Sequence, residues 1–413
     1  MTNPNPNPLY TKANFDMDAI IDTAKELREF EKEFRALFPE REHLIHQMIL
    51  AILCKHHVLI YGKYGTAKSM LIKQFVEGIG ADKDKLFTIE LTRYTTESDV
   101  FGPIDVPKLR EEGVQVRNPV GTMRAAHFVD VGEIFDAQGL LRSMLGTLNE
   151  RFYSRGADSG AVPLHTAFAS TNVDPKELIR RYPDSDAIID RFLFHSKVNW
   201  LSDDASFRKM FSNILGGKTS VAPVDHDSLL EAARLVSSPT DQIKPELIDT
   251  YIEIVKTIRE IDEWKRFSDR AFAQWLVVLE ANAVLNGRYD VGLEDFYALK
   301  YVVCNGADHE QVELFDDKIA PIIAQAIENK QAMSIDDAVL LAIDAIENDW
   351  PATPDANSTA SDLQATYRKL KSHLEKAETM HPQLPETEQK IAALKTRISD
   401  EIMQTLVHFE GAA

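Results

Sequence analysis

Residues 58–69 read VLIYGKYGTAKS, and this stretch decides the fold class. Its first four residues are apolar, β-branched or aromatic, which favours a short buried strand. The glycines that follow favour a turn, and apolar residues then recur at helical spacing over residues 69–78. A strand, a glycine turn and a helix in direct succession predict a βα unit whose turn binds phosphate.

Residues 62–69 follow the pattern G-x-x-x-x-G-K-[ST] except at Ala67, which stands where the pattern has glycine. Ala67 fits if its backbone is helical, because a Cβ is tolerated there. Lys68 would reach the β- and γ-phosphates, and the Ser69 hydroxyl would ligate Mg²⁺. The residues expected to bind ATP are Gly62, Lys63, Tyr64, Gly65, Thr66, Ala67, Lys68, Ser69 and Met70.

The rest of the first half alternates between strand and helix patterns. Short apolar runs lie at residues 86–91, 127–131, 166–170 and 192–198. Helical stretches separate several of them, notably residues 138–149. This alternation predicts an α/β fold, a P-loop NTPase core with a mostly parallel sheet covered by helices.

Strand patterns end near residue 202, and residues 226–345 read as successive amphipathic helices. The predicted organisation is a disordered N-terminus (1–13), an α/β core (14–205), an all-α domain (206–310), a helical extension (311–350), a linker (351–361) and a C-terminal helical hairpin (362–413).

Composition restricts the functional class. The chain has 413 residues with 46 Lys+Arg against 65 Asp+Glu, a net charge of −19. Such a charge repels phosphate backbones and makes nucleic-acid coating unlikely by electrostatics. Two cysteines far apart indicate a reducing, cytoplasmic location rather than a disulfide framework, and no stretch is long and apolar enough for a membrane span.

An acidic pair follows the apolar run at residues 127–131. Asp130 can hold Mg²⁺ and Glu133 can polarise the attacking water, although Val131 and Gly132 separate the two acids where adjacency is usual. A local bulge would account for the spacing. The alternative for Glu133 is an ordinary carboxylate at a helix N-terminus.

Asn172 ends the next apolar run and can orient the hydrolytic water at the carboxyl edge of the sheet. Capping of a helix that starts near Pro175 is an equally good interpretation of its position. Arg191 and Arg270 can stabilise charge on the γ-phosphate, although a single arginine is most often part of a surface ion pair.

Taken together, these motifs resemble those of AAA+ ATPases, and in detail the MoxR family, especially its RavA-like members. The resemblance covers about residues 40–310 and is carried by residues 65–69, 100–103, 148–152, 170–172, 190–192, 268–270 and 281–288. It implies a helical lid after the core, ATP bound between core and lid, and a hexameric ring. By the same resemblance Asn172 corresponds to sensor 1, and Arg270 to sensor 2 near the γ-phosphate. Arg191 is the choice for an arginine finger acting on the neighbouring subunit, with Arg151 as the alternative.

The resemblance also places residues 97–120 as a helix-2 insert and residues 152–163 as a hairpin that faces a pore or partners. The expected function is Mg²⁺-dependent ATP hydrolysis coupled to remodelling or chaperone-like maturation of a partner protein, such as one with a von Willebrand factor A domain. Two other functions stay open. One is a nucleotide-gated binding scaffold with little turnover, and the other is a nucleic-acid-associated AAA+ motor.

Overall fold

The computed structural model describes residues 12–181, 185–218, 220–238, 241–306, 308–348 and 385–410, with scattered positions between 368 and 379. Contacts divide the chain into two compact units, residues 1–322 and 323–413. The predicted linker at 351–361 and most of the predicted N-terminal segment at 1–13 lie outside the described residues.

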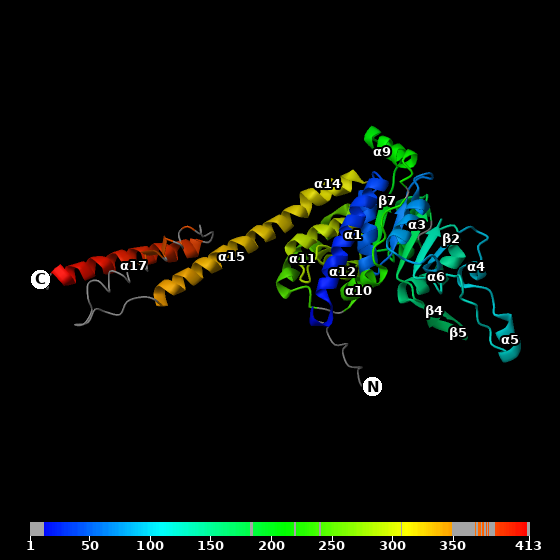
Figure 1. Ribbon diagram of the computed structural model, residues 1–413, viewed down its shortest axis with the longest axis horizontal. Helices are drawn as coiled ribbons and strands as arrows, with labels where there is room; N and C mark the ends of the chain where they lie inside the picture. The colour runs from blue at the N-terminus through cyan, green and yellow to red at the C-terminus, as the bar shows by residue number, and fades with distance from the viewer. Residues whose placement is uncertain are drawn as a thin grey trace. The chain divides into compact units, whose positions relative to one another are not determined.

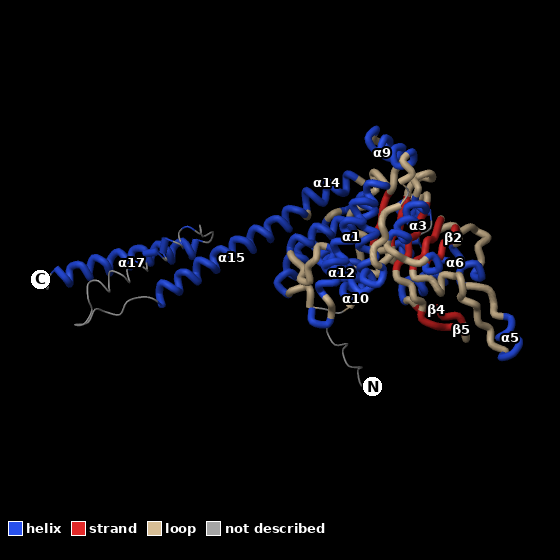
Figure 2. Tube along the Cα trace, in the orientation of Figure 1, coloured by secondary structure: helices blue, strands red, loops and turns tan. Residues whose placement is uncertain are grey.

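A five-stranded parallel sheet forms the centre of the first unit, and Figure 2 shows its strands in red. The strand order is β2-β3-β6-β1-β7. The strands are β1 (Val58–Tyr61), β2 (Leu86–Glu90), β3 (Phe128–Gly132), β6 (Thr166–Thr171) and β7 (Phe194–Lys197). Every neighbouring pair is parallel, which confirms the predicted α/β core.

Helices cover both faces of this sheet because its strands are apolar on both sides. In β6, Phe168 faces Phe75 of α3 (Lys68–Gly78), with ring centroids 6.0 Å apart. The alternate residue Ala167 belongs instead to a buried cluster with Leu141 and Met144 of α6 (Gln138–Glu150). Successive side chains of a strand point to opposite faces, so α3 and α6 lie on different sides of the sheet.

The helices around the sheet and their connections fill the rest of the first unit (Figure 1). On the amino-terminal side are η1 (Lys12–Asn14), α1 (Met17–Leu37) and α2 (Glu42–Cys54). Between strands are η2 (Lys83–Lys85), α4 (Glu97–Phe101), α5 (Val106–Glu112), α7 (Pro175–Arg181) and α8 (Ser185–Ile189). A separate antiparallel hairpin pairs β4 (Phe152–Arg155) with β5 (Asp158–Ala161).

Among the described residues of the first unit, only helical elements follow β7. They are α9 (Asp204–Leu215), α10 (His226–Ser237), η3 (Pro245–Leu247), α11 (Ile248–Glu260), η4 (Asp262–Trp264), α12 (Asp269–Leu285), η5 (Leu293–Leu299), α13 (Lys300–Val303) and α14 (His309–Lys318). Helix α2 is buried almost all round because it contacts α1, α10, α12, β1 and β7. The predicted boundaries at 205/206 and 310/311 fall inside α9 and α14, where the chain is continuously helical.

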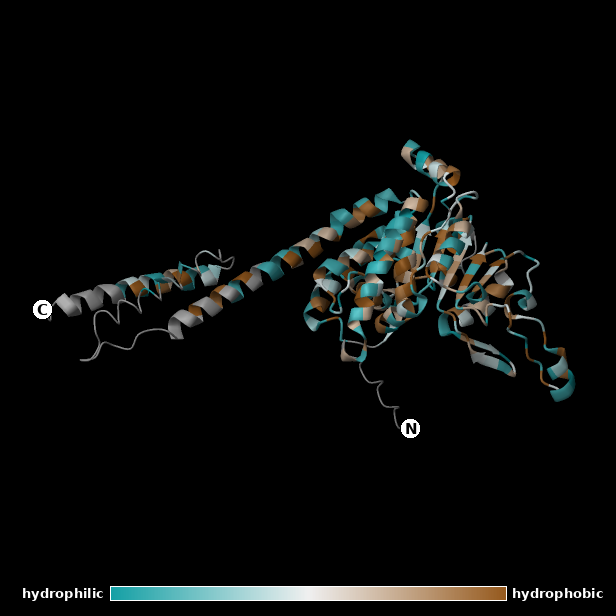
Figure 3. Cartoon of the chain, in the orientation of Figure 1, coloured by the Kyte–Doolittle hydropathy of each residue, from teal (hydrophilic) through white to brown (hydrophobic). Residues whose placement is uncertain are grey.

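Helix α15 (Ala320–Asn348) crosses into the second unit, which also contains α17 (Pro385–Glu410). In Figure 3, hydrophobic and hydrophilic residues alternate along α15. Val339 and Ile343 of α15 share one buried cluster with Leu374 and with Ile391 and Leu394 of α17. The helical spacing of these leucines and isoleucines therefore reflects packing. Among the described residues, no helix combines the length and the apolar character that crossing a bilayer requires.

Candidate nucleotide-binding site

A cavity of about 500 Å³ lies where β1 meets the loop that follows it. Gly62 has φ 148°, and a Cβ there would come within 2.1 Å of the Val198 carbonyl oxygen, so only glycine fits. The loop is thus held against the segment that follows β7. The cavity is lined by Tyr64, Gly65, Thr66, Ala67, Lys68, Ser69, Met70, Thr88, Ile89, Glu90, Asp130, Gly132, Glu133, Ser170 and Asn172.

Ala67 does not have the helical backbone that its Cβ was expected to require. It lies in the left-handed region, with φ 60° and ψ 26°, at the residue before α3. A left-handed conformation costs an L-residue roughly 1–2 kcal/mol relative to the right-handed helix. Alanine in place of the pattern's glycine therefore strains the backbone at residue 67.

Ala67→Gly should stabilise the protein by about 0.5–1 kcal/mol, because relief of this strain exceeds the added entropy of the unfolded chain. Urea unfolding measures the change. The same substitution at Ala205, which is exposed within the right-handed helix α9, should destabilise by up to about 1 kcal/mol. Destabilisation at both positions would contradict the left-handed assignment.

One hydrogen-bonded chain joins three of the predicted site residues at the carboxyl edge of the sheet. Lys68 Nζ donates to Asn172 Oδ1 at 3.0 Å, and also to the loop carbonyls of Gly62 at 2.8 Å and Lys63 at 3.1 Å. Asn172 Nδ2 donates to Glu133 Oε1, and its backbone N–H donates to Glu133 Oε2 at 3.3 Å. Strand β6 lies between β1 and β3, which places Asn172 between the lysine and the glutamate. Its amide is therefore occupied within the site and does not cap α7, where Asp174 accepts from Lys176 N instead.

Glu133 is the first residue after β3 and lies in a turn, five positions before α6 begins. The ladder between β2 and β3 is regular through the pair Glu90 and Gly132, so no bulge separates the two acids. Instead Glu133 itself adopts φ 48°, and this turns its side chain into the cavity. Partial burial raises its pKa, with nearby Asp136 adding to the effect and Lys68 opposing it. This placement disfavours the interpretation of Glu133 as a helix N-terminal carboxylate.

Asp130 is buried on β3, and its Oδ1 has no hydrogen-bond partner. Asp130 lines the cavity, and a buried carboxylate oxygen without a partner is suited to a hard cation such as Mg²⁺. Within the described part of the chain, no three His, Cys, Asp or Glu side chains gather as a metal cage. That fits Mg²⁺ as well, since it is commonly held by one or two carboxylates together with the substrate's phosphates.

Burial raises the pKa of Asp130 from 3.8 to about 7. The folded chain therefore holds this proton more tightly than the unfolded chain, and the free energy of unfolding should fall as pH rises between those values. Asp130→Asn should remove that dependence and leave the variant more stable than the parent by up to a few kcal/mol at about pH 8. Urea unfolding without Mg²⁺ or nucleotide at about pH 5 and pH 8 measures it. Identical pH slopes for the two proteins would contradict the prediction.

Glu90 is a cavity residue that the sequence analysis missed. It ends β2 opposite Gly132 and contributes to raising the pKa of Glu133. The signal was available, because an acidic residue at the carboxyl end of a parallel strand faces the same crevice as Asn172. The strand at residues 86–91 was predicted, but its position beside β3 was not. Pairing of β2 with β3 is what brings Glu90 to the site.

A second cavity, of about 530 Å³, adjoins the phosphate loop and is mainly apolar. It shares Gly65, Thr66, Ala67 and Met70 with the first cavity. Its other walls come from the end of α1, from the segment after β7 and from α9, and include Phe38, Pro39, Trp200, Leu201, Phe207 and Ile214. Trp200 Nε1 donates to the Tyr64 carbonyl at 3.0 Å, which ties that segment to the phosphate loop.

The three predicted arginines lie outside the phosphate cavity of their own chain. Arg270 is exposed at the start of α12 and is close enough to His56 to lower the pKa of that buried imidazole. His56 precedes β1, whereas the phosphate loop follows β1. Arg270 therefore lies away from the cavity of its own chain, whereas the resemblance placed it near the γ-phosphate.

Arg151 donates to backbone carbonyls within its own chain, with Nε 3.0 Å from Leu164 O and Nη2 bonded to Lys55 O. Such bonds give it a structural role and weaken the case for it as the arginine finger. Arg191 follows α8, and the adjacent Asp190 accepts from Ser268 Oγ at 3.3 Å. Since Ser268 precedes Arg270 by two residues, Arg191 and Arg270 lie in the same region of the surface.

Two family models match successive parts of the chain. The model described as the MoxR domain in MoxR-vWA-beta-propeller ternary systems matches residues 25–225. A model of an AAA lid domain matches residues 246–314.

Known proteins match most of the same region. Two uncharacterized proteins of Methanocaldococcus jannaschii are 27% identical over 293 residues and 26% over 294, covering 71% and 70% of this chain and 73% and 75% of theirs. Chaperone MoxR1 of Mycobacterium tuberculosis is 24% identical over 309 residues, or 70% of this chain and 78% of its own. The crystal structure of a candidate ATPase from Cytophaga hutchinsonii matches with TM-score 0.54 and 18% identity over 75% of this chain and 96% of the other, a likeness of fold alone.

Proposed function

Because the chain belongs to the MoxR family of AAA+ ATPases, we propose that it hydrolyses ATP with Mg²⁺ and uses this reaction to remodel a partner protein. The proposal depends on one observation, the hydrogen bonds that join Lys68 to Asn172 and Asn172 to Glu133. These bonds place a cation, an amide and a carboxylate together at a cavity with a glycine-containing phosphate loop. These are the groups that phosphoryl transfer to water requires.

Each charged or polar group of the site has a separate role in this proposal. Lys68 leaves the loop carbonyls to bind the β- and γ-phosphates, while loop N–H groups bind the remaining phosphate oxygens. Ser69 and Asp130 would hold Mg²⁺, which supplies positive charge to the β- and γ-phosphate oxygens when bound. Glu133 accepts a proton from the attacking water, and Asn172 orients both the glutamate and the water. The raised pKa of Glu133 suits a base that must accept a proton near neutral pH.

The adenosine part of ATP fits the adjoining apolar cavity. That cavity begins at the phosphate loop and ends at α9, so base and ribose would lie between the core and the segment that leads to the lid. An apolar pocket with few polar groups is the usual environment for a heterocyclic ligand. Closure of α9, whose Phe211 and Ile214 are exposed, on the base would couple nucleotide binding to lid position.

We further propose that the protein forms a hexameric ring in the cytoplasm and that Arg191 acts on the ATP of the neighbouring subunit. Arg191 and Arg270 do not line the cavity of their own chain, which supports action on a neighbour. The matched family model is described from systems that contain vWA and β-propeller components, so a vWA-domain protein is the favoured partner. The free, buried cysteines fit a reducing compartment.

Mixing two inactive variants tests this proposal. Lys68→Ala destroys a subunit's own phosphate site, and Arg191→Ala removes the arginine that it offers to its neighbour. Lys68→Ala alone should lose ATPase activity by about 10²–10³-fold, and Arg191→Ala alone by about 10³-fold or more. In a mixture of equal parts, about a quarter of the interfaces pair an intact site with an intact arginine, so activity should return toward that fraction of the parent's.

Arg234→Ala is the matched control, since Arg234 is an exposed arginine on α10 paired with Glu231. It should keep parental activity. A mixture of Lys68→Ala and Arg191→Ala that remains as inactive as its components would rule out action of Arg191 on a neighbour.

A further inference from the structure

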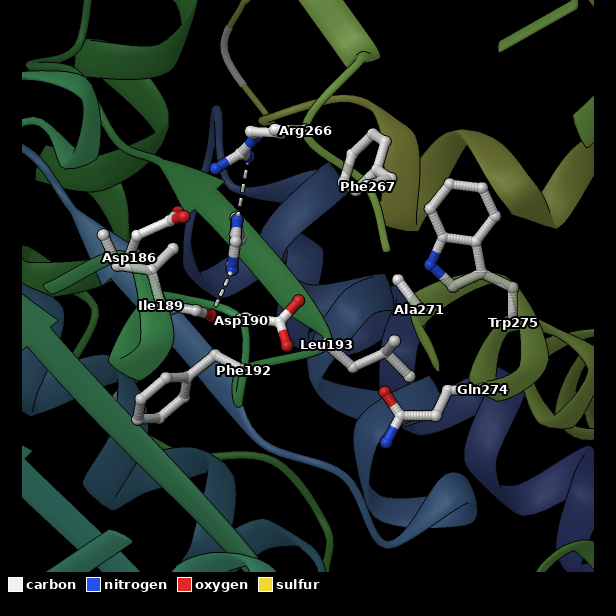
Figure 4. Close-up of a pocket in the computed structure, with 11 residues that line it drawn as sticks. Asp186, Ile189, Asp190, Phe192, Leu193, Arg266, Phe267, Ala271, Gln274 and Trp275 are labelled. Atoms are coloured by element: carbon white, nitrogen blue, oxygen red, sulfur yellow. Dashed lines mark hydrogen bonds between the residues drawn. The ribbon is translucent and has the colours of Figure 1, made fainter. Parts of the chain in front are cut away.

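A small cavity separates the segment around α8 from the start of the lid helix α12, and Figure 4 shows the residues that line it. Arg266 enters this cavity from the lid side. Its Nη2 lies 3.3 Å from His195 Nδ1, and His195 Nε2 lies 3.1 Å from the Ile189 carbonyl oxygen. Dashed lines in Figure 4 mark both hydrogen bonds, which lead from Arg266 to Ile189.

The hydrogen-bonding groups at each end determine the state of the imidazole. A carbonyl oxygen only accepts, so His195 Nε2 carries the proton, and Nδ1 then accepts from the guanidinium. Burial, followed by the charge of Arg266, lowers the pKa of His195 to about 3. The imidazole is thus neutral throughout the physiological range, and the connection from Arg266 to Ile189 is stable against ordinary changes in pH.

Arg266 is exposed as a residue, but its guanidinium end lies near several core groups. Local burial lowers its pKa, while Tyr61, Asp186, Asp174 and Asp190 act in the opposite direction. All four groups lie at the carboxyl ends of β1 and β6 or in the segment around α8. The position of Arg266 is therefore electrostatically tied to the core.

A second lid-to-core bond reaches the next residue. Ser268 caps α12 by accepting from Ala271 N at 3.2 Å, and its hydroxyl also donates to Asp190 Oδ1 at 3.3 Å. The two connections thus end at Ile189 and Asp190, immediately before Arg191. In the same turn, Arg191 N donates to the Ile188 carbonyl at 3.1 Å.

We propose that Arg266 and His195 are positioning residues that set Arg191 against the phosphates of the neighbouring subunit. The lid of one subunit then controls hydrolysis in the next, because a shift of Arg266 is transmitted through a rigid imidazole to the turn that carries Arg191. This inference rests on the proposed action of Arg191 on a neighbour. It adds the residues through which lid position reaches that arginine.

The mixing experiment shows in which of the two subunits of an interface Arg266 acts, the one that supplies Arg191 or the one that supplies the phosphate site. Arg266→Met is added either to the Lys68→Ala subunit, which supplies Arg191, or to the Arg191→Ala subunit, which supplies only the phosphate site. On the supplying side it should lower the recovered activity on the order of 100-fold, as expected for a misplaced catalytic group. On the receiving side the recovery should equal that of the mixture without Arg266→Met.

Arg266→Lys on the supplying side should restore much of the loss, since an ammonium can still donate to His195 Nδ1. Gln274→Ala is the matched control, because Gln274 lines the same cavity outside the connection from Arg266 to Ile189. Equal losses on both sides would mean that Arg266 only supports the fold, and no loss on either side would mean that it has no such role. Either result overturns the inference. If the mixture without Arg266→Met stays inactive, the proposed action of Arg191 fails, and this inference fails with it.

Discussion

Lys68→Ala should reduce ATP hydrolysis by about 10²–10³-fold, because it removes the one cation that the described chain places inside the phosphate cavity. The ammonium is half-buried, and burial lowers its pKa; it lies against loop carbonyls and the Asn172 amide. Exchange of these neutral acceptors for phosphate oxygens pairs the ammonium with negative charge, which strengthens its binding. Isothermal calorimetry should show a matching loss of ATP affinity.

Lys73→Ala is the control for that experiment. Lys73 lies on the same helix, α3, but is exposed and outside the cavity. It should keep parental affinity and turnover. Equal ATP binding by the parent and Lys68→Ala would remove the basis for a phosphate site at this loop.

Glu133→Gln should separate binding from hydrolysis. The amide keeps the size of the side chain but cannot accept a proton from water, so turnover should fall by about 10²–10⁴-fold. ATP affinity should stay at or above that of the parent, because a negative charge near the γ-phosphate has been removed. Single-turnover phosphate release and calorimetry together measure the two effects.

Asp136→Asn and Glu90→Gln are the companions of this variant. Asp136 is exposed in the same turn and acts on Glu133 only through its charge, so its replacement should change turnover little. Glu90 of β2 also lines the cavity. If only Glu90→Gln loses turnover, Glu90 and not Glu133 is the base. Normal turnover in both glutamine variants would overturn the assignment of either glutamate as the base, whereas little turnover by the parent itself would indicate a nucleotide-gated scaffold.

The ends of the strands were predictable to within a residue or two because the signals are local. Residues 58–61 and 166–171 are apolar runs bounded by polar or glycine residues, and such patterns depend only on neighbours in the chain. The gathering of Asn172 with the phosphate loop followed from the rule that ligands bind at the carboxyl ends of parallel strands. Both predictions rested on short-range patterns.

The backbone at Ala67 and Glu133 was not predictable in the same way. Both residues are left-handed, although neither is glycine. Glu133 bonds to Asn172, which is 39 positions away. Local preference favours the opposite conformation, and tertiary contacts overrode it.

By itself, the sequence determined that this chain has a glycine-containing loop between a strand and a helix, a parallel α/β core and a helical second half. Periodicity and turn chemistry act over a few residues, and they suffice for those features. Only the tertiary structure decided that Glu90 joins the site, that Arg151 bonds to its own backbone, and that Arg270 lies away from its own cavity. These outcomes depend on which strands are neighbours and where the lid packs, and both are set by contacts between residues far apart in the chain.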